Sequence, residues 1–301
     1  MPITLPPISR RRFLAGSMAA GASVLVARPT WAAEPATDAN RFALLSDTHV
    51  AGERDHVERG VNMFAHAQEA VREVALLDPR PAAAIINGDC AFLHGKQHDY
   101  EAFVEAVKPL REAGLTLHCT LGNHDHRERF WKAIPATAGQ DQAVDERHIT
   151  VIESARANWF LLDSLDLTNA TPGTLGADQL TWLARALDAR TDRPALVMLH
   201  HPPDPELNRG GLTDTGALLE VLISRPHVKA YFYGHNHVWI RRQQQGLHLV
   251  GLPAVAYTFS PEQPSGWIDA HLTDTGITLA LRSIDPTHSQ HGEKVELLWR
   301  S

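Results

Sequence analysis

Short apolar runs alternate with longer amphipathic stretches through the first two thirds of the chain. The runs that predict buried strands span residues 41–45, 82–86, 115–120, 148–153, 158–163, 195–199 and 228–233. Apolar residues at helical spacing predict helices over about 55–77, 99–111 and 175–187. Because strands and helices alternate, we expect an α/β fold with a largely parallel sheet covered by helices.

Beyond residue 238 the helical signals fade, and the remaining apolar runs are short. They predict strands over residues 247–252, 254–259, 267–272, 277–283 and 295–299. Strands that follow one another without helices pair antiparallel, so the second half should add mostly antiparallel strands. The chain has 301 residues, of which 44% are hydrophobic, and this is enough for one large domain with a full core.

The N-terminal segment differs from the rest. Residues 9–14 read Ser-Arg-Arg-Arg-Phe-Leu, a weakly apolar run follows over 15–27, and small residues suited to cleavage follow over 30–32. The apolar run is too short to span a bilayer as a stable helix. The order Ser-Arg-Arg-x-Phe-Leu resembles the bacterial twin-arginine export signal. We therefore predict a signal peptide over 1–32, a folded domain over 33–301, the twin-arginine machinery as a partner, no stable membrane anchor, and a periplasmic or secreted protein.

The charge balance limits the partners of the chain. Its formal net charge is −7, and residues 1–32 hold four Arg and no acidic residue, so the mature chain would carry −11. Such a chain repels nucleic acids and anionic membranes, which bind clustered Lys and Arg. We expect a small substrate and no nucleic-acid partner.

Only two cysteines occur, each near the end of a predicted strand. Cys90 and Cys119 do not stand at a metal-ligand spacing such as Cys-x-x-Cys. We interpret them as two buried thiols. A disulfide is the alternative if the two strands are neighbours in an oxidising compartment.

Polar side chains cluster at five predicted strand ends. The clusters are Asp47-Thr48-His49, Asn87-Gly88-Asp89, Gly122-Asn123-His124-Asp125, His200-His201-Pro202-Pro203 and Gly234-His235-Asn236-His237. Each one alone has an ordinary explanation as a turn, a helix cap or a buried histidine. Because the carboxyl ends of parallel strands meet at one edge of a sheet, all five together predict a single site.

The candidate ligands in these clusters are four imidazoles, two carboxylates and one amide. They belong to Asp47, His49, Asp89, Asn123, His200, His235 and His237. This set is too large for one tetrahedral zinc and fits two adjacent ions that share a carboxylate. Without a thiolate, the ions should be divalent or trivalent Mn, Fe, Zn or Co. Two such ions can hold a shared hydroxide for attack on phosphorus, so phosphate-ester hydrolysis fits best.

Three further residues in the clusters suit other roles. His124 directly follows a ligand and can act as general acid or electrostatic stabiliser, while Asp125 could fix the tautomer of His124. His201 could donate to the substrate phosphate or to a carboxylate that orients a ligand. A packed histidine beside the two prolines is an equally good explanation of His201.

In this order the five motifs resemble the calcineurin-like metallophosphoesterase superfamily over about residues 41–240. The resemblance implies a four-layer α-β-β-α sandwich with mixed sheets and a two-metal site. Carried over by position, the first metal takes Asp47, His49, Asp89 and His237, and the second takes Asp89, Asn123, His200 and His235. Asp89 bridges the two.

Within that superfamily, the pairing of Gly-Asn-His-Asp with His-His-Pro-Pro is similar to cyclic-nucleotide and glycerophosphodiester phosphodiesterases. Purple acid phosphatases carry a Tyr ligand where this chain has Phe92. The resemblance favours small phosphodiesters as substrates, with a phosphomonoesterase as the alternative. A catalytically silent binding scaffold is less favoured, because such a protein would lack some of the metal ligands and this chain has all seven. Hydrolysis of another ester or of a nucleic acid also stays open.

Overall fold

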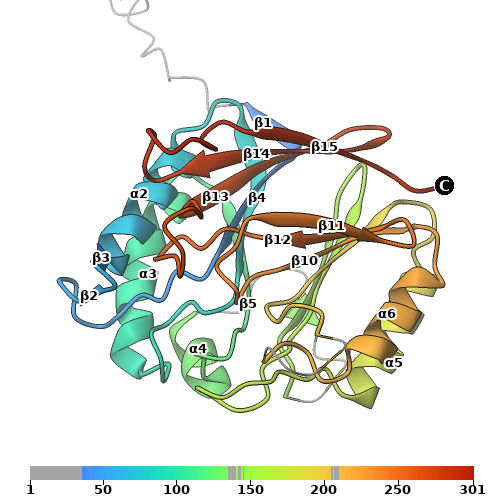
Figure 1. Ribbon diagram of the computed structural model, residues 1–301, viewed down its shortest axis with the longest axis horizontal. Coiled ribbons are helices and arrows are strands. Elements are labelled where there is room, and N and C mark those ends of the chain that lie inside the picture. The colour runs from blue at the N-terminus through green and yellow to red at the C-terminus, as the bar shows by residue number, and fades with distance from the viewer. Residues whose placement is uncertain (1–35, 135–139, 142–143, 145, 205, 207–209) are drawn as a thin grey trace, which may run out of the picture. The chain divides into compact units, whose positions relative to one another are not determined.

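The computed structural model describes residues 36–134, 140, 141, 144, 146–204, 206 and 210–301. Residues 36–301 form one compact unit, and the predicted signal peptide lies outside the described residues. Two large sheets stack at the centre of this unit, with helices on their outer faces (Figure 1).

The first sheet has six strands in the order β15-β14-β13-β1-β4-β5. Its strands are β1 (Thr37–Ser46), β4 (Arg80–Asn87), β5 (Thr116–Thr120), β13 (Gly266–Leu272), β14 (Gly276–Ser283) and β15 (Lys294–Leu298). β1, β4 and β5 pair in parallel, whereas β13, β14 and β15 form an antiparallel meander on β1. The parallel half therefore carries three of the predicted polar clusters at one edge.

The second sheet has seven strands in the order β11-β12-β10-β9-β8-β7-β6. Its strands are β6 (Gln140–Asp141), β7 (Ile149–Glu153), β8 (Asn158–Leu161), β9 (Ala195–Met198), β10 (Val228–Tyr233), β11 (Ile240–Gln244) and β12 (Leu247–Gly251). β8, β9, β10 and β12 run in parallel, and the predicted β7–β8 hairpin is confirmed. The other two polar clusters follow β9 and β10.

Three separate cores define four layers. Along β1, Phe42 and Leu44 point into a core between the two sheets, where the ring of Phe42 lies 5.4 Å from that of Trp159. Ala43 and Leu45 point to the other side, into the core under the helices of the first sheet. A third core lies between the second sheet and its helices. Both faces of β1 are buried, which explains its unbroken apolar run, and the predicted α-β-β-α sandwich is confirmed.

Five helices complete the described part of the chain. They are α2 (Met63–Ala75), α3 (Gln97–Glu112), α4 (Arg127–Ala133), α5 (Ala177–Asp188) and α6 (Thr215–Ile223). α2 and α3 cover the first sheet and α5 and α6 the second (Figure 1). No helix in the described ranges is long and apolar enough to cross a membrane.

The structure corrects several predicted elements. The helix predicted over 55–77 begins only at Met63, because Arg59 and Gly60 adopt left-handed φ values of 51° and 80°. These two residues form the turn of a small hairpin, β2 (Val57–Glu58) and β3 (Val61–Asn62). The run 254–259 is irregular rather than a strand, and α6 and β11 were not predicted.

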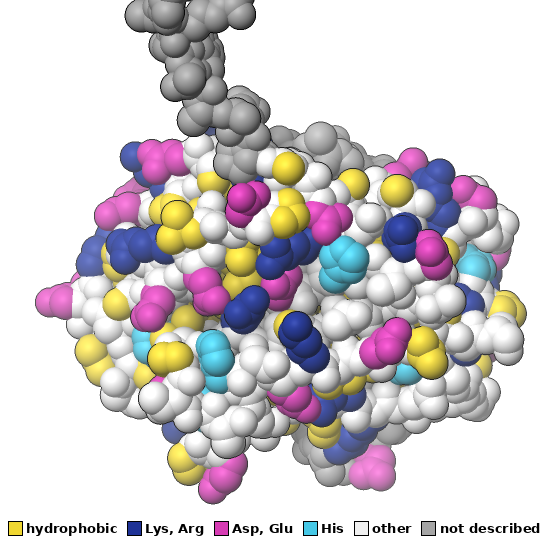
Figure 2. Space-filling model, turned by 90° about the horizontal axis from the view of Figure 1, so that it is seen from above, with side chains coloured by type: hydrophobic (Ala, Val, Ile, Leu, Met, Phe, Trp, Pro, Cys, Tyr) yellow, Lys and Arg dark blue, Asp and Glu magenta, His cyan; other side chains and the backbone are white. Residues whose placement is uncertain are grey.

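Lys and Arg side chains are interspersed with Asp and Glu on the face of the molecule shown in Figure 2. They do not gather into a basic stripe on that face. That face therefore lacks the clustered cations that bind a polyanion.

Candidate metal centre

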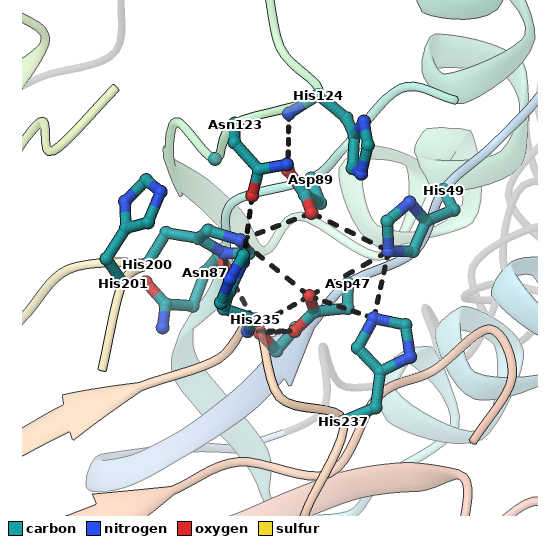
Figure 3. A network of polar contacts seen from close by, with 12 residues as sticks. Asp47, His49, Asn87, Asp89, Asn123, His124, His200, His201, His235 and His237 are labelled. Carbon is teal, nitrogen blue, oxygen red and sulfur yellow. Dashed lines mark hydrogen bonds and ion pairs between the residues drawn. The ribbon is translucent and has the colours of Figure 1, made fainter. Parts of the chain in front are cut away.

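The five polar clusters meet at the C-terminal ends of β1, β4, β5, β9 and β10. The first three strands belong to the first sheet and the last two to the second, so both sheets contribute to the site. Figure 3 shows the side chains that follow these strands pointing toward one another. All seven residues predicted as ligands lie in this group, namely Asp47, His49, Asp89, Asn123, His200, His235 and His237. Of these, Asp47 and His200 are completely buried, while His49, Asp89 and His237 are 2% exposed.

Five of the ligand residues have a left-handed backbone conformation, which non-glycine residues adopt only infrequently. Left-handed φ values between 45° and 68° occur at Asp47, His49, Asp89, His235 and His237. Each such non-glycine conformation costs of order 1–3 kcal/mol and persists only where surrounding contacts hold it. The contacts here are bonds between the loops, for example His49 N to Asp89 O at 2.9 Å and His124 N to Asp89 Oδ1 at 2.8 Å.

One ligand group forms around Asp47. Potential ligand atoms of Asp47, His49 and His237 all lie within 4.8 Å of one another. His237 Nε2 stands 3.3 Å from Asp47 Oδ1 and 3.0 Å from His49 Nε2. His49 Nε2 is in turn 3.6 Å from Asp89 Oδ2, so Asp89 adjoins this group.

A second group forms on the other side of Asp89. Potential ligand atoms of Asp89, His200 and His235 lie within 4.8 Å of one another, and His200 Nε2 is 3.2 Å from Asp89 Oδ2. Asn123 joins through its Oδ1, which is 2.8 Å from His235 Nδ1. Asp89 Oδ2 therefore faces both groups, as a shared ligand would.

The orientation of the imidazoles fits metal binding. His237 Nδ1 donates to Tyr257 O at 2.6 Å, and His200 Nδ1 donates to Asn87 O at 3.0 Å, so each ring turns its Nε2 toward the centre. Histidines that bind metals usually donate their other nitrogen in this way. His200 Nε2 is buried and forms no hydrogen bond, and its neighbour at 3.2 Å is the carboxylate of Asp89, so a cation held between the two groups would satisfy both.

Burial and charge shift the pKa values in the centre. Burial lowers the pKa of His49 to about 3 and that of His235 to about 4, so both rings are neutral at pH 7 and able to bind a metal. Burial also disfavours charge on His200, but the carboxylates of Asp89 and Asp47 outweigh it and raise the pKa of His200 to about 10. Although burial opposes their ionisation, the nearby imidazoles hold the pKa values of Asp47 and Asp89 below the usual range.

His124 lies at the side of the centre. One of its ring nitrogens is within 4.8 Å of potential ligand atoms of His49 and Asp89. Its Nδ1 contacts Leu93 O at 2.9 Å, so Nδ1 carries a proton and Nε2 is left for a proton transfer.

The predicted role of Asp125 is wrong. Its carboxylate does not hold the ring of His124 and instead accepts hydrogen bonds from four groups, three in the surrounding loops and one on α3. The donors are Gly122 N at 2.9 Å, Cys90 N and Ala91 N at 3.2 Å each, and the Tyr100 hydroxyl at 3.1 Å. These bonds tie the loop after β4 to the loop after β5, so Asp125 is a positioning residue, and Leu93 O orients His124.

His201 is completely buried, which does not favour the predicted contact with substrate. Its Nδ1 pairs with Ser164 Oγ at 2.8 Å, and its ring lies 5.3 Å from that of His200 and 5.1 Å from that of His235. It therefore packs behind the second ligand group. Cys90 and Cys119 are buried free thiols, in agreement with our first interpretation.

Asn87 is a supporting residue to which sequence reasoning assigned no role. Its Oδ1 accepts from Thr120 Oγ1 at 2.7 Å, and its Nδ2 donates to Leu199 O at 3.2 Å. Thr120 ends β5 and Leu199 follows β9, so this one amide joins the two sheets beneath the site. The only sequence signal was its place just before Gly88-Asp89.

Comparisons with known proteins agree with this geometry. The family model described as calcineurin-like phosphoesterase matches residues 40–239. The chain is 32% identical over 232 residues to the 3′,5′-cyclic adenosine monophosphate phosphodiesterase CpdA of Pseudomonas aeruginosa. The aligned residues cover 75% of this chain and 80% of that protein. It is 25% identical over 237 residues to a 3′,5′-cyclic-nucleotide phosphodiesterase of Nostoc, covering 77% and 84% of the two.

Among solved structures, a dimetal phosphatase from Danio rerio superposes with a TM-score of 0.68 at 17% identity. The match covers 88% of this chain and 99% of that one, and it supports the fold. Because the family model spans most of the chain and a relative above 30% identity spans three quarters of it, this protein belongs to the calcineurin-like phosphoesterase family and is a metal-dependent phosphoesterase.

Proposed function

We propose that this phosphoesterase hydrolyses small phosphodiesters, with 3′,5′-cyclic nucleotides as the first candidates. The observation that carries the proposal is Asp89, whose Oδ2 faces a ligand group on either side. Relatives named as cyclic-nucleotide phosphodiesterases support this choice of substrate class.

The seven ligand residues would hold two metal ions. Bound ions would supply a water nucleophile at neutral pH and neutralise charge on the phosphate oxygens. With a proton on each ring nitrogen, His124 can give the Nε2 proton to the departing oxygen and keep the Nδ1 proton in its bond to Leu93 O, which holds the ring in place. The buried base of the site, with Asp47 and His200 completely inaccessible, excludes bulk water from these groups.

The ligand residues have no direct cationic partner in the described part of the chain, which favours a diester over a monoester. Within the described part of the chain, no Lys or Arg side chain forms a hydrogen bond or ion pair with any of the seven ligand residues. A monoester carries a second negative charge and would gain from such a cation. A silent scaffold is disfavoured because all seven ligand residues are present and face one centre.

The test is the ratio of turnover on bis(4-nitrophenyl) phosphate to turnover on 4-nitrophenyl phosphate with Mn-loaded protein. A ratio well above one supports the diester proposal. A ratio well below one makes the protein a phosphomonoesterase. Failure to hydrolyse either ester with Mn, Fe, Zn or Co would instead identify a binding scaffold.

We also propose export through the twin-arginine pathway, which rests on residues 9–14 alone. Replacing Arg10 and Arg11 by Lys should retain the protein in the cytoplasm of a bacterial host. The unaltered chain should appear in the periplasm, cleaved near residue 32. Equal distribution of the two proteins between cell fractions would contradict the proposal.

A further inference from the structure

An aromatic wall stands beside the first ligand group. It consists of the rings of Tyr257 and Phe259, which belong to the irregular segment before β13. The guanidinium of Arg59, from the turn of the β2–β3 hairpin, lies against these rings. None of the three belongs to the motifs at the strand ends. The mechanism above uses none of their side chains.

The two aromatic rings stack directly on metal-ligand candidates. The Phe259 ring lies 4.5 Å from the His237 ring at an interplanar angle of 23°, and the Tyr257 ring lies 5.3 Å from the His49 ring at the same angle. Tyr257 is 8% exposed and supports the site from behind, whereas Phe259 is 57% exposed. An aromatic ring that is more than half exposed next to a buried polar site is suited to contact a ligand.

Arg59 adds a planar cation to this wall. Its guanidinium carbon lies 5.0 Å from the centre of the Phe259 ring and 5.7 Å from that of Tyr257. Within the described ranges no ion pair joins Arg59 to a carboxylate, and its guanidinium lies against the two aromatic rings instead. The guanidinium shows that a flat π-system fits against the exposed aromatic surface.

The wall is firmly attached to the metal centre. Val255 N donates to Ser46 O at 2.9 Å and Ala256 N donates to Asp47 O at 3.1 Å, so the segment follows the end of β1. His66 of α2 bonds to Ala256 O at 2.9 Å, and Tyr257 packs in a small core with Met63. These contacts fix Tyr257 relative to the ligand residues, and the stacking of Phe259 on His237 places the second ring beside it.

We propose that Phe259, with Tyr257 beside it, forms a subsite that stacks the base of a nucleotide whose phosphate lies at the metal centre. Because His237 covers one face of the Phe259 ring and the Arg59 guanidinium lies over it, the base enters between Phe259 and Arg59, and the Arg59 side chain moves outward to cover the base. The subsite deepens the proposed function and rests on it. Phe259 is one stacked ring away from His237, and Arg59 is a further layer out, so neither adjoins the reacting phosphate. A nucleotide carries its base one ribose away from phosphorus, so the base can contact an aromatic ring at the side of the centre, whereas a small aliphatic ester has no flat group that could stack there.

The test compares two ligands that differ only in the base, AMP and ribose 5-phosphate. Isothermal titration calorimetry on the Mn-loaded protein gives a Kd for each. Stacking of one base on an aromatic ring should make AMP bind roughly 5- to 100-fold more tightly than ribose 5-phosphate.

Phe259→Ala should bring that ratio close to one by weakening AMP while leaving ribose 5-phosphate within about twofold. Phe259→Trp should retain the preference because it keeps a stacking face. Arg59→Gln should weaken AMP by roughly 2- to 5-fold. The control is Leu298→Ala, which removes a comparably exposed apolar side chain on β15 and should change neither Kd.

Equal Kd values for the two ligands in the unaltered protein, or an unchanged ratio in Phe259→Ala, would overturn the subsite. These binding measurements do not depend on turnover. If the unaltered protein hydrolyses diesters but shows no preference for AMP over ribose 5-phosphate, the subsite alone is refuted. Failure of diester hydrolysis with the base preference intact would refute the proposed function alone.

Discussion

Gly88 lies between Asn87 and the shared ligand Asp89 and leaves no space for a side chain. Its φ of 72° is left-handed, and a Cβ atom there would stand 2.6 Å from His200 Nδ1 and 2.8 Å from Gly122 N. Non-bonded heavy atoms keep roughly 3.5 Å apart, so Gly88→Ala must move the His200 ring or the backbone by about 1 Å. Metal–ligand distances tolerate about 0.2 Å, so we expect loss of the metal bound by His200.

Gly88→Ala destabilises the protein in two ways, through backbone strain and through steric overlap. A substitution at a second glycine, where only the strain occurs, separates the two contributions. Left-handed backbone costs a non-glycine residue about 1–2 kcal/mol, and overpacking adds about 1–3 kcal/mol, so Gly88→Ala should lower the free energy of unfolding by about 2–5 kcal/mol. Gly292 has a similar φ of 79°, but its Cβ would meet nothing within 4 Å. Gly292→Ala should therefore show the strain alone and retain all metal.

Both variants are measured in the same way. Metal per chain is determined by mass spectrometry after Mn-loaded protein is desalted, and urea titrations of the metal-free proteins give the free energy of unfolding. Circular dichroism confirms that Gly88→Ala is folded under the conditions of the metal assay. If folded Gly88→Ala binds two metals with the affinity of the unaltered protein, the close approach of Gly88 to His200 does not control the site.

Three other substitutions test separate parts of the structure. Asp89→Ala should remove both metals because a shared ligand serves both groups, and one ion retained at full affinity would show that Asp89 is not shared. His124→Ala should keep its metals but lower kcat by roughly 10²–10⁴-fold, and an unchanged kcat would leave His124 without a role in proton transfer. Burial lowers the pKa of His118 from its ordinary 6.5 to about 4, so protons bind the unfolded chain first and stability falls as the pH drops through that window. Between pH 7 and 4 the free energy of unfolding of the metal-free protein should therefore fall by up to about 3 kcal/mol more than that of metal-free His118→Gln. If urea titrations show the same fall for both proteins, the prediction is contradicted.

Sequence reasoning found the position of the site because each cluster directly follows a buried strand. Ala195–Met198 is apolar on both faces, and His200 comes just after it, so its side chain had to lie at the sheet edge. The same argument placed Asp89 after β4. Sequence reasoning failed where the local pattern was ambiguous. Val57 and Val61 fit one face of a helix as well as they fit the two strands of the hairpin that turns at Arg59.

Side-chain partners from distant segments were beyond the reach of this reasoning. Asp125 adjoins His124 in sequence, yet its carboxylate turns toward the N–H groups of Cys90 and Ala91, which lie in another loop. Several donors to one buried carboxylate outweigh a single imidazole. Asn87 was overlooked for the same reason, because its partners belong to β5 and to the segment after β9.

The sequence by itself determined the alternation of strands and helices, the family, and the seven residues that converge at the strand ends. These follow from local apolar periodicity and from the chain order of the motifs, which a linear sequence records. The tertiary structure alone decided which oxygen faces both ligand groups, which carbonyl orients His124, and that Phe259 and Arg59 stand beside His237. These contacts join segments as many as 200 residues apart in the chain, and only the packing of two sheets and their loops brings them together.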